Sequence, residues 1–246
     1  MDSIETRRRQ YLQAMGIDVW ERRAAAAESS PAETPRGGVF LRSDSEPLPN
    51  VADSVQSTIM NMDWPILEQA ILTCTRCPLH KTRTHAVPGV GNRKAEWLVI
   101  GEAPGADEDR QGEPFVGRAG QLLNSMLKAI GLEREAVYIA NILKCRPPNN
   151  RDPLPEEAAT CEPYLQRQIT LLKPKIILAV GRIAAQNLLK TDTKIGALRG
   201  KRHVYPGSDI PVVVTYHPAY LMRSPQEKRK AWEDLQLACR VFKGEV

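Results

Sequence analysis

The stretch at residues 101–120, GEAPGADEDRQGEPFVGRAG, constrains the fold of this chain more than any other. It follows an apolar run at residues 97–100 that is typical of a buried strand, and it precedes residues 119–130, whose apolar side chains recur at helical spacing. With five glycines, two prolines and five carboxylates, the stretch is too polar and irregular for a core. We predict a loop between the carboxyl end of a strand and a helix, which is where open α/β sheets bind ligands. The alternative is a long surface turn.

Strands and helices alternate along most of the chain. Apolar runs predict strands at residues 97–100, 137–142, 176–180 and 212–216, and helical spacing predicts helices at residues 64–72, 119–130, 155–172, 182–189 and 224–242. A basic loop that contains glycine is expected at residues 193–201. Alternation of this kind indicates an α/β fold in which helices cover both faces of a parallel sheet.

The amino-acid composition excludes few classes of protein. The formal net charge of +5 suits a polyanionic partner, but it is equally common in proteins that bind no nucleic acid. The chain has no run of about 18 apolar residues, so we expect no membrane span. The charged start, MDSIETRRRQ, is unlike a secretory signal, which predicts a reducing compartment. In that compartment five cysteines favour metal or cluster ligation over disulfides.

The cysteines have a spacing that suggests ligation. Cys74 and Cys77 form a C-x2-C pair before a proline, Cys145 begins a proline-rich loop, and Cys161 lies in an expected helix. Four cysteines from two regions can hold either a zinc ion or a four-iron cluster, and the wide spacing from Cys145 to Cys161 fits a cluster better. The alternative is that Cys145 and Cys161 are small core residues. Cys239, in the last helix, is expected in the core.

The first 61 residues differ from the rest in composition. Residues 1–23 contain an apolar set followed by a polar, proline-containing segment at residues 24–61 that is typical of a flexible linker. We expect residues 1–23 to be either a short helical docking peptide or a disordered tail. The peptide YLQAMGIDVW resembles the N-terminal peptide of the psi subunit of the bacterial clamp loader, which implies a replication partner. The folded domain is expected at residues 62–246.

Four motifs occur together in this chain: GEAPG after the first strand, PFVGRAG in the same loop, Asn141 at the end of the second strand, and His217-Pro after the last. With the cysteines in matching order, this set resembles the family 4, iron–sulfur, uracil-DNA glycosylases over about residues 62–243. The resemblance implies a three-layer α/β/α sandwich around a four-stranded parallel sheet, with a flexible N-terminal extension. It also implies a structural [4Fe–4S] cluster on four ligands, namely Cys74, Cys77, Cys145 and Cys161.

The activity implied by this resemblance is the release of uracil from single- and double-stranded DNA, leaving an abasic site. The base must leave the stack to be reached. Phe115 is expected to stack on it, and the Asn141 amide to read its edge and reject cytosine, because a mispaired buried polar group is costly. His217 is expected to donate to uracil O2 and stabilise the departing anion, for which a neutral imidazole suffices.

The same loop is expected to supply the remaining chemistry. Glu102 is the carboxylate nearest the expected site, able to position water or stabilise the developing cation on the sugar. The backbone of Gly101, Ala103 and Gly105 is expected to contact the base. Gly105 stands where some uracil glycosylases carry a tyrosine against thymine, and Ala103 where others carry an aspartate. Thymine exclusion and the group that activates water therefore stay open.

Contacts to the DNA backbone are less constrained by the sequence. The expected contacts are Arg118, Lys201, Arg202, Leu221 and Arg223. The cations among them are expected at phosphates, although most surface arginines contact nothing. Leu221 and its neighbour Met222 are expected either to wedge into the duplex or to be packed. The acidic run at residues 107–109 is interpreted as a solvated loop rather than a metal site.

Three other functions are alternatives to a glycosylase that turns over. A covalent-capture relative carries a Lys-Arg-Arg-Ile-His loop that is absent between Cys145 and Cys161, so we expect turnover and no trapping. A non-catalytic DNA-binding module stapled by zinc or an iron–sulfur cluster is the alternative function. A P-loop nucleotide site is disfavoured because no Lys-Ser/Thr follows the glycines. We expect a monomer that is cytoplasmic and associated with the nucleoid.

Overall fold

The structure is a computed structural model that describes residues 51–246, with side chains described from residue 56 onward. The expected docking peptide at residues 1–23 and most of the expected linker lie outside these residues. One correction concerns where the folded part begins. Helix α2, Val51–Met60, lies inside the segment expected to be a linker, and its Ile59 is buried in the core. The folded part therefore begins before residue 62.

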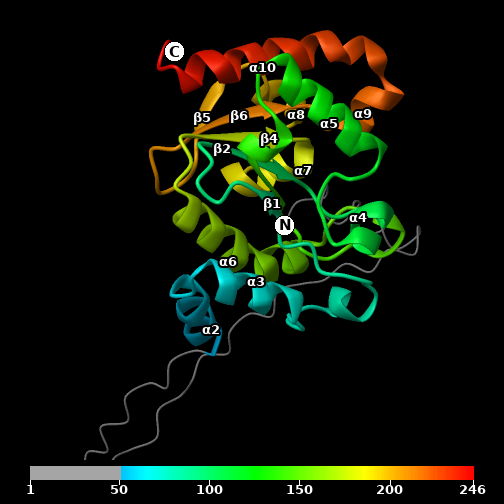
Figure 1. The fold of residues 1–246 in the computed structure, drawn as a ribbon, viewed down its shortest axis with the longest axis vertical. Coiled ribbons are helices and arrows are strands. Elements are labelled where there is room, and N and C mark those ends of the chain that lie inside the picture. Colours follow the sequence, from blue (N-terminus) through cyan, green and yellow to red (C-terminus); the bar gives the residue numbers. More distant parts are fainter. Residues whose placement is uncertain (1–50) are drawn as a thin grey trace, which may run out of the picture. The chain divides into compact units, whose positions relative to one another are not determined.

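A single six-stranded sheet forms the centre of the described residues (Figure 1). Its order is β1-β3-β2-β4-β6-β5, where the strands are β1 Val90–Gly91, β2 Trp97–Gly101, β3 Tyr138–Asn141, β4 Ile176–Val180, β5 Arg202–Val204 and β6 Pro211–Thr215. The four central strands are parallel, which confirms the predicted sheet. The outer strands β1 and β5 are antiparallel to their neighbours and were not predicted.

Helices cover both faces of the sheet. Their bounds are α3 Trp64–Leu72, α4 Ala106–Gln111, α5 Arg118–Ala129, α6 Pro155–Leu172, α7 Arg182–Leu189, α8 Ile195–Leu198, α9 Pro218–Arg223 and α10 Lys228–Phe242. The predicted helices at 64–72, 155–172 and 182–189 are confirmed with the same bounds. Helix α3 begins where it does because Asp63 Oδ1 accepts a hydrogen bond from Ile66 N at 3.1 Å, a cap that contributes about 1 kcal/mol.

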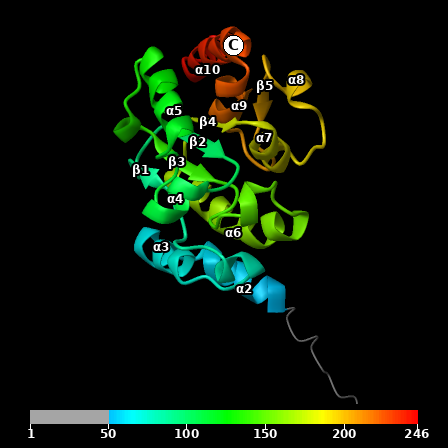
Figure 2. The same cartoon turned by 90° about the vertical axis from the view of Figure 1, so that its right-hand side faces the viewer.

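Alternation along the strands divides the apolar residues into two cores. In β2, Leu98 and Ile100 pack in one core with α2, α3, α6 and α7, whereas Trp97 and Val99 pack in the other with α5 and α10. This follows from the period of two in a strand, and it gives a helix–sheet–helix sandwich. Figures 1 and 2 show α6 and α3 on one side of the sheet and α10 and α5 on the other. The half-buried Cys239 packs in the second core, as expected.

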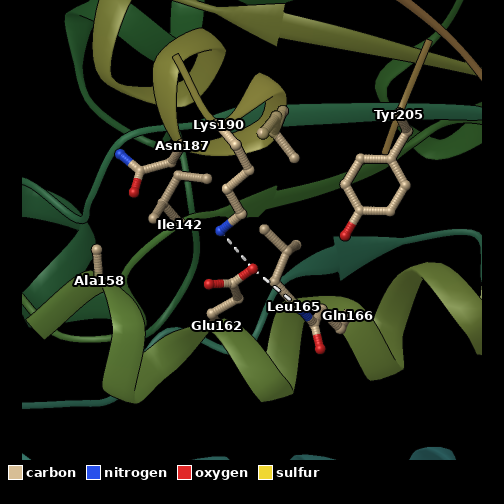
Figure 3. A pocket seen from close by; sticks show the side chains of 9 residues that line it. Ile142, Ala158, Glu162, Leu165, Gln166, Asn187, Lys190 and Tyr205 are labelled. Atoms are coloured by element: carbon tan, nitrogen blue, oxygen red, sulfur yellow. Dashed lines mark hydrogen bonds and ion pairs between the residues drawn. The ribbon is translucent and has the colours of Figure 1, made fainter. Parts of the chain in front are cut away.

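A small cavity lies between α6 and α7. It has a volume of about 20 Å³, which suffices for one water molecule. Figure 3 shows the Lys190 ammonium pointing across it to Glu162, with which it forms an ion pair, and Gln166 donates to the same carboxylate at 2.9 Å. These contacts tie α6 to the end of α7, so the cavity is part of the packing between these helices.

The carboxyl ends of the parallel strands lie at one edge of the sheet. Gly101 at the end of β2 pairs in register with Asn141 at the end of β3, and Val180 of β4 pairs with Thr215 of β6. The loops that follow these strands therefore meet at this edge. They carry nearly all the residues that the sequence predicts to be functional.

Candidate active site

A cavity of about 430 Å³ opens at the carboxyl ends of β2, β3 and β6. It is lined by Glu102, Ala103, Pro104, Gly105, Glu108, Phe115, Ala119, Asn141, Pro147, Asn150, Arg151, Asp152, His217, Ala219, Tyr220 and Arg223. The fold thus brings together residues from three separate segments, which follow β2, β3 and β6. Apart from Gly101, which lies beneath it, every expected base-binding and catalytic residue lines this one cavity.

Asn141 presents an unpaired polar atom at the floor of this cavity. Its side chain is 2% exposed, and its Oδ1 has no hydrogen-bond partner among the described residues. A buried acceptor of this kind costs about 1–3 kcal/mol unless a ligand completes it. A Cβ added to Gly101 would overlap Asn141 Oδ1 and lie 2.6 Å from the Phe115 ring. Only glycine therefore fits at position 101, where the backbone passes directly beneath both side chains.

Phe115 is held in a conformation that most residues avoid. Its φ is 54°, in the left-handed region, and its ring is 6% exposed. Arg134 holds the segment by donating to the carbonyl oxygens of Pro114 at 2.6 Å and Phe115 at 3.2 Å. Gly120 permits the close approach of α5, because a Cβ there would overlap the Phe115 carbonyl. The ring position is therefore fixed by the surrounding backbone before any ligand binds.

Glu108 joins the two glycine-rich halves of the loop. Its Oε2 accepts from Gly105 N at 3.1 Å, and its Oε1 accepts from Val116 N at 3.0 Å and Gly117 N at 3.1 Å. Asp109 is 4% exposed and accepts from Thr84 N at 2.9 Å. The interpretation of residues 107–109 as a solvated acidic loop is therefore wrong for two of its three carboxylates, which satisfy backbone N–H groups.

His217 stands opposite Phe115, with ring centroids 5.6 Å apart. It caps α9, and its Nδ1 accepts a hydrogen bond from Ala219 N at 3.2 Å, so Nε2 carries the proton. Burial lowers the pKa of His217 to about 4; the charge of Arg223 adds to this effect and that of Glu108 opposes it. The ring is therefore neutral at pH 7 and offers one N–H donor.

Glu102 is the carboxylate with the most unusual acidity in the cavity. The pKa of the Glu102 carboxyl is raised to about 7. Burial is the main cause, the negative charge of Asp152 acts in the same direction, and the positive charge of Arg182 opposes the shift. A carboxyl with this pKa gives up or takes a proton easily near neutral pH. Perturbed groups facing a cavity are typical of catalytic sites.

Asp152, Arg151 and Tyr220 line the cavity although the sequence did not predict them. Asp152 forms an ion pair with Arg182 at 2.5 Å, and Arg151 forms a two-pronged pair with the buried Glu157. Arg151 and Asp152 lie in the loop between β3 and α6, whereas Tyr220 lies in α9. No signal in the sequence links that loop to the GEAPG motif.

The residues expected to contact DNA differ in their exposure and in their position relative to the cavity. Arg118 and Arg223 are exposed, and Arg223 lines the cavity. Lys201 and Arg202 are exposed at the edge strand β5 and do not line the cavity. Leu221 is 1% exposed and packs in the second core with residues of α5 and α10. Of the two alternatives for Leu221, this position corresponds to packing and not to a wedge.

The four expected ligand cysteines lie near one another. Cys145 and Cys161 are buried, whereas Cys74 and Cys77 are half-buried. Burial raises the pKa of the Cys145 thiol, and charges on Cys77 and Cys74 raise it as well. Burial raises the pKa of the Cys161 thiol to about 12, and the charges of Cys145 and Cys74 act in the same direction. Cys145 and Cys161 also lie in one hydrophobic core, and Cys74 and Cys77 pack against it.

The surroundings of the buried sulfurs fit a bound cluster. Arg83 Nη1 donates to Cys145 Sγ at 2.9 Å, and the Lys144 backbone N–H donates to Cys161 Sγ at 3.3 Å. Such donors suit ligated thiolates, which are negatively charged. Among the described residues, no three His, Cys, Asp or Glu side chains converge closely enough for a single metal ion. An iron–sulfur cluster does not need such convergence, because each cysteine binds a different iron.

Comparison with known proteins agrees with this arrangement. Residues 88–236, which include the cavity and all six strands of the sheet, match the Uracil DNA glycosylase superfamily. The fold is that of this class of protein.

Individual relatives show to which type within this superfamily the chain is similar. The chain is 51% identical to the type-4 uracil-DNA glycosylase of Archaeoglobus fulgidus over 68% of this chain and 86% of the relative. It is 44% identical to the type-4 enzyme of Pyrobaculum aerophilum, over 72% and 93%, and 42% identical to that of Thermotoga maritima, over 73% and 95%. The chain therefore belongs to the uracil DNA glycosylase superfamily and, within it, to the type-4 uracil-DNA glycosylases.

Proposed function

We propose that this chain hydrolyses the N-glycosidic bond of deoxyuridine in DNA, releasing uracil and leaving an abasic site. The observation that carries the proposal is the unpaired Asn141 Oδ1, in a cavity that the rings of Phe115 and His217 also line. Uracil offers a donor at N3 and an acceptor at O4, which complement the two ends of an amide. Cytosine carries an amino group, which is a donor, in place of O4, and its N3 is an acceptor. A fixed Asn141 amide therefore disfavours cytosine.

His217 and Phe115 bind the departing base. When the bond between N1 and C1′ breaks, its electron pair goes to uracil, and negative charge develops on N1 and O2. The neutral His217 donates through Nε2 to O2, which stabilises that charge without prior proton transfer. Phe115 stacks on the ring, and its fixed backbone means that little order is lost on binding.

Glu102 acts on water at the sugar. In its carboxylate form it accepts a proton from the water whose oxygen bonds to C1′, and it stabilises the positive charge that the sugar carries as uracil leaves. The proton passes finally to the uracil anion. Asp152, which lines the same cavity, favours this cation electrostatically and keeps the pKa of Glu102 high.

A [4Fe–4S] cluster on Cys74, Cys77, Cys145 and Cys161 belongs to the same proposal. Its support is the neighbouring sulfurs, the donors on Cys145 and Cys161, and the type-4 relatives. The cluster supplies structural cross-links between the segment after α3, the loop after β3 and helix α6. None of the steps above passes through it.

Partners follow from this activity. We propose single- and double-stranded uracil-containing DNA as substrate, a monomer as the working unit, and the nucleoid as its place. No helix among the described residues is long and apolar enough to cross a membrane. Docking of residues 1–23 to the clamp loader stays a proposal, which is contradicted if deletion of these residues leaves clamp-loader capture unchanged.

A non-catalytic DNA-binding module explains neither the unpaired Asn141 Oδ1 nor the shifted pKa of Glu102.

Excision from a uracil-containing oligonucleotide tests the proposal. The protein is purified without oxygen, incubated with the DNA, and abasic sites are cleaved afterwards with alkali. We expect scission by the wild type and a decrease of about 100-fold or more in Asn141→Ala and His217→Ala. Asn187→Ala, at the small cavity between α6 and α7, is the matched control and retains activity. Absence of scission by a cluster-loaded wild type contradicts the proposal.

A further inference from the structure

Tyr220 is an exposed aromatic side chain at the rim of the active-site cavity. It lies in α9, three residues after His217, lines the cavity and is 37% exposed. Its neighbour Leu221 is buried and packs α9 against the second core. Tyr220 is thus the large side chain that α9 offers to a molecule entering the cavity.

The ring of Tyr220 rests on a rigid support. Its centroid is 5.1 Å from that of Tyr216, and the Arg199 guanidinium lies 5.6 Å from the Tyr216 centroid on its ring face. Arg199 is itself fixed, because it donates to Asp234 Oδ2 at 3.0 Å and pairs with Oδ1 at 2.9 Å, and Asp234 is fully buried. Arg199, Tyr216 and Tyr220 therefore form a continuous series of contacts that leads from the buried Asp234 to the rim, with the two tyrosine rings inclined at 41°.

A preordered aromatic face of this kind suits a nucleobase. Aromatic side chains bind successive bases of a single strand by stacking, with little dependence on sequence, because every base has a π face. The exposed Arg223 follows in the same helix and lines the same cavity, where a phosphate of that strand would pass. The cavity itself takes the base that leaves the stack, so the base at its rim is the adjacent one.

We propose that Tyr220 is the stacking site for the nucleobase next to the deoxyuridine, supported from behind by Tyr216 and Arg199. This inference rests on the proposed function, since it assumes a DNA strand whose uracil occupies the cavity. Flipping the uracil removes the stacking partner of its neighbour. The Tyr220 ring replaces that partner and holds the strand in register with His217 and Asn141.

A cycle that changes the protein and the DNA together tests this inference. kcat/KM for excision is measured on single-stranded oligonucleotides in which the base on the 5′ or the 3′ side of the uracil is present or replaced by a stable abasic analogue. With the wild type, loss of the stacked neighbour should lower kcat/KM by about tenfold. With Tyr220→Ala, kcat/KM should already be about tenfold lower on the intact strand and should not fall further.

Further variants separate stacking from folding. Tyr220→Phe keeps the ring and should respond like the wild type, whereas Tyr220→Leu keeps apolar contact with Tyr216 and should behave like Tyr220→Ala. Trp232→Ala removes another exposed aromatic ring, on α10 and outside the cavity, and is the matched control that keeps the wild-type response. An equal response of wild type and Tyr220→Ala to both analogues overturns the inference. Failure of the wild type to excise uracil at all contradicts the proposed function instead.

Discussion

At the scale of single residues, the site depends on side chains whose chemistry is set by burial. Glu102 and His217 line one cavity, yet burial moves the pKa of the carboxyl up to about 7 and that of the imidazole down to about 4. Each shift disfavours the charged form, in keeping with desolvation as its main cause. The result is a proton acceptor that changes charge near neutral pH beside a donor that does not.

The acidity of Glu102 predicts the pH dependence of excision. In the proposed mechanism the Glu102 carboxylate is the active form. Because its pKa is about 7, single-turnover rates should rise with pH, by about tenfold from pH 6 to pH 8. His217 contributes no step in this range, since it is neutral throughout. Glu102→Gln should be slow and nearly independent of pH. A wild-type rate that falls with rising pH contradicts this role.

The close packing around Gly101 predicts that a substitution there lowers activity while the protein still folds. In Gly101→Ala the new methyl group overlaps Asn141 Oδ1 and the Phe115 ring, so both must move out of the uracil-binding position. We expect kcat/KM to fall by about 100-fold, because misplacement by about 1 Å costs that much. Gly196→Ala is the matched control, as nothing lies within 4 Å of its added Cβ. Equal activity of the two variants contradicts the close approach.

At the scale of secondary-structure elements, the sequence predicts most of the long, periodic segments and misses the short ones. Helix α2, with ten residues, is an exception, because it lies in a segment whose composition is typical of a linker. Helix α6 and strand β4 were predicted with the bounds that the structure gives. Helices α4 and α9, of six residues each, were missed because they are shorter than the window in which periodicity is read. Strands β1 and β5 are edge strands of two and three residues, too short for an alternating pattern.

The candidate site was predictable where its residues belong to compact motifs. GEAPG, Asn141 and His217 each follow a strand, and parallel strands bring their carboxyl ends together. Asp152 and Tyr220 depend on how a loop and a short helix fold over the cavity, which no local pattern encodes. Glu108 left a readable signal, because a glutamate three residues after Gly105 suits the start of a helix.

The Glu108 contacts predict that one carboxylate holds the whole loop. Glu108→Ala leaves the N–H groups of Gly105, Val116 and Gly117 without their acceptor. We expect a loss of about 2–3 kcal/mol in unfolding free energy, measured by urea denaturation. Asp107→Ala is the matched control: its pair with Arg110 is exposed, and exposed pairs contribute at most about 1 kcal/mol. If both variants lose equal stability, Glu108 does not hold the loop.

At the scale of the whole molecule, the cysteines join segments that the chain separates widely. Cys74 and Cys77 follow α3, whereas Cys145 lies after β3 and Cys161 within α6. A group bound by all four fastens α3 and α6 to the loop that begins after Asn141. The proposed cluster would therefore stabilise the active-site edge of the sheet from the side of the molecule that carries α2, α3 and α6 (Figures 1 and 2).

This arrangement predicts the metal content and its effect on stability. Protein purified without oxygen should hold about four irons per chain, because each of the four cysteines binds one iron of the proposed cluster. Cys161→Ser should lose the iron and the visible absorbance and should unfold at a lower temperature, since the ligand lies inside α6. Cys239→Ser, in α10 and away from the other cysteines, is the matched control and should keep the iron. One zinc per chain, or a full iron content in Cys161→Ser, contradicts a four-cysteine cluster.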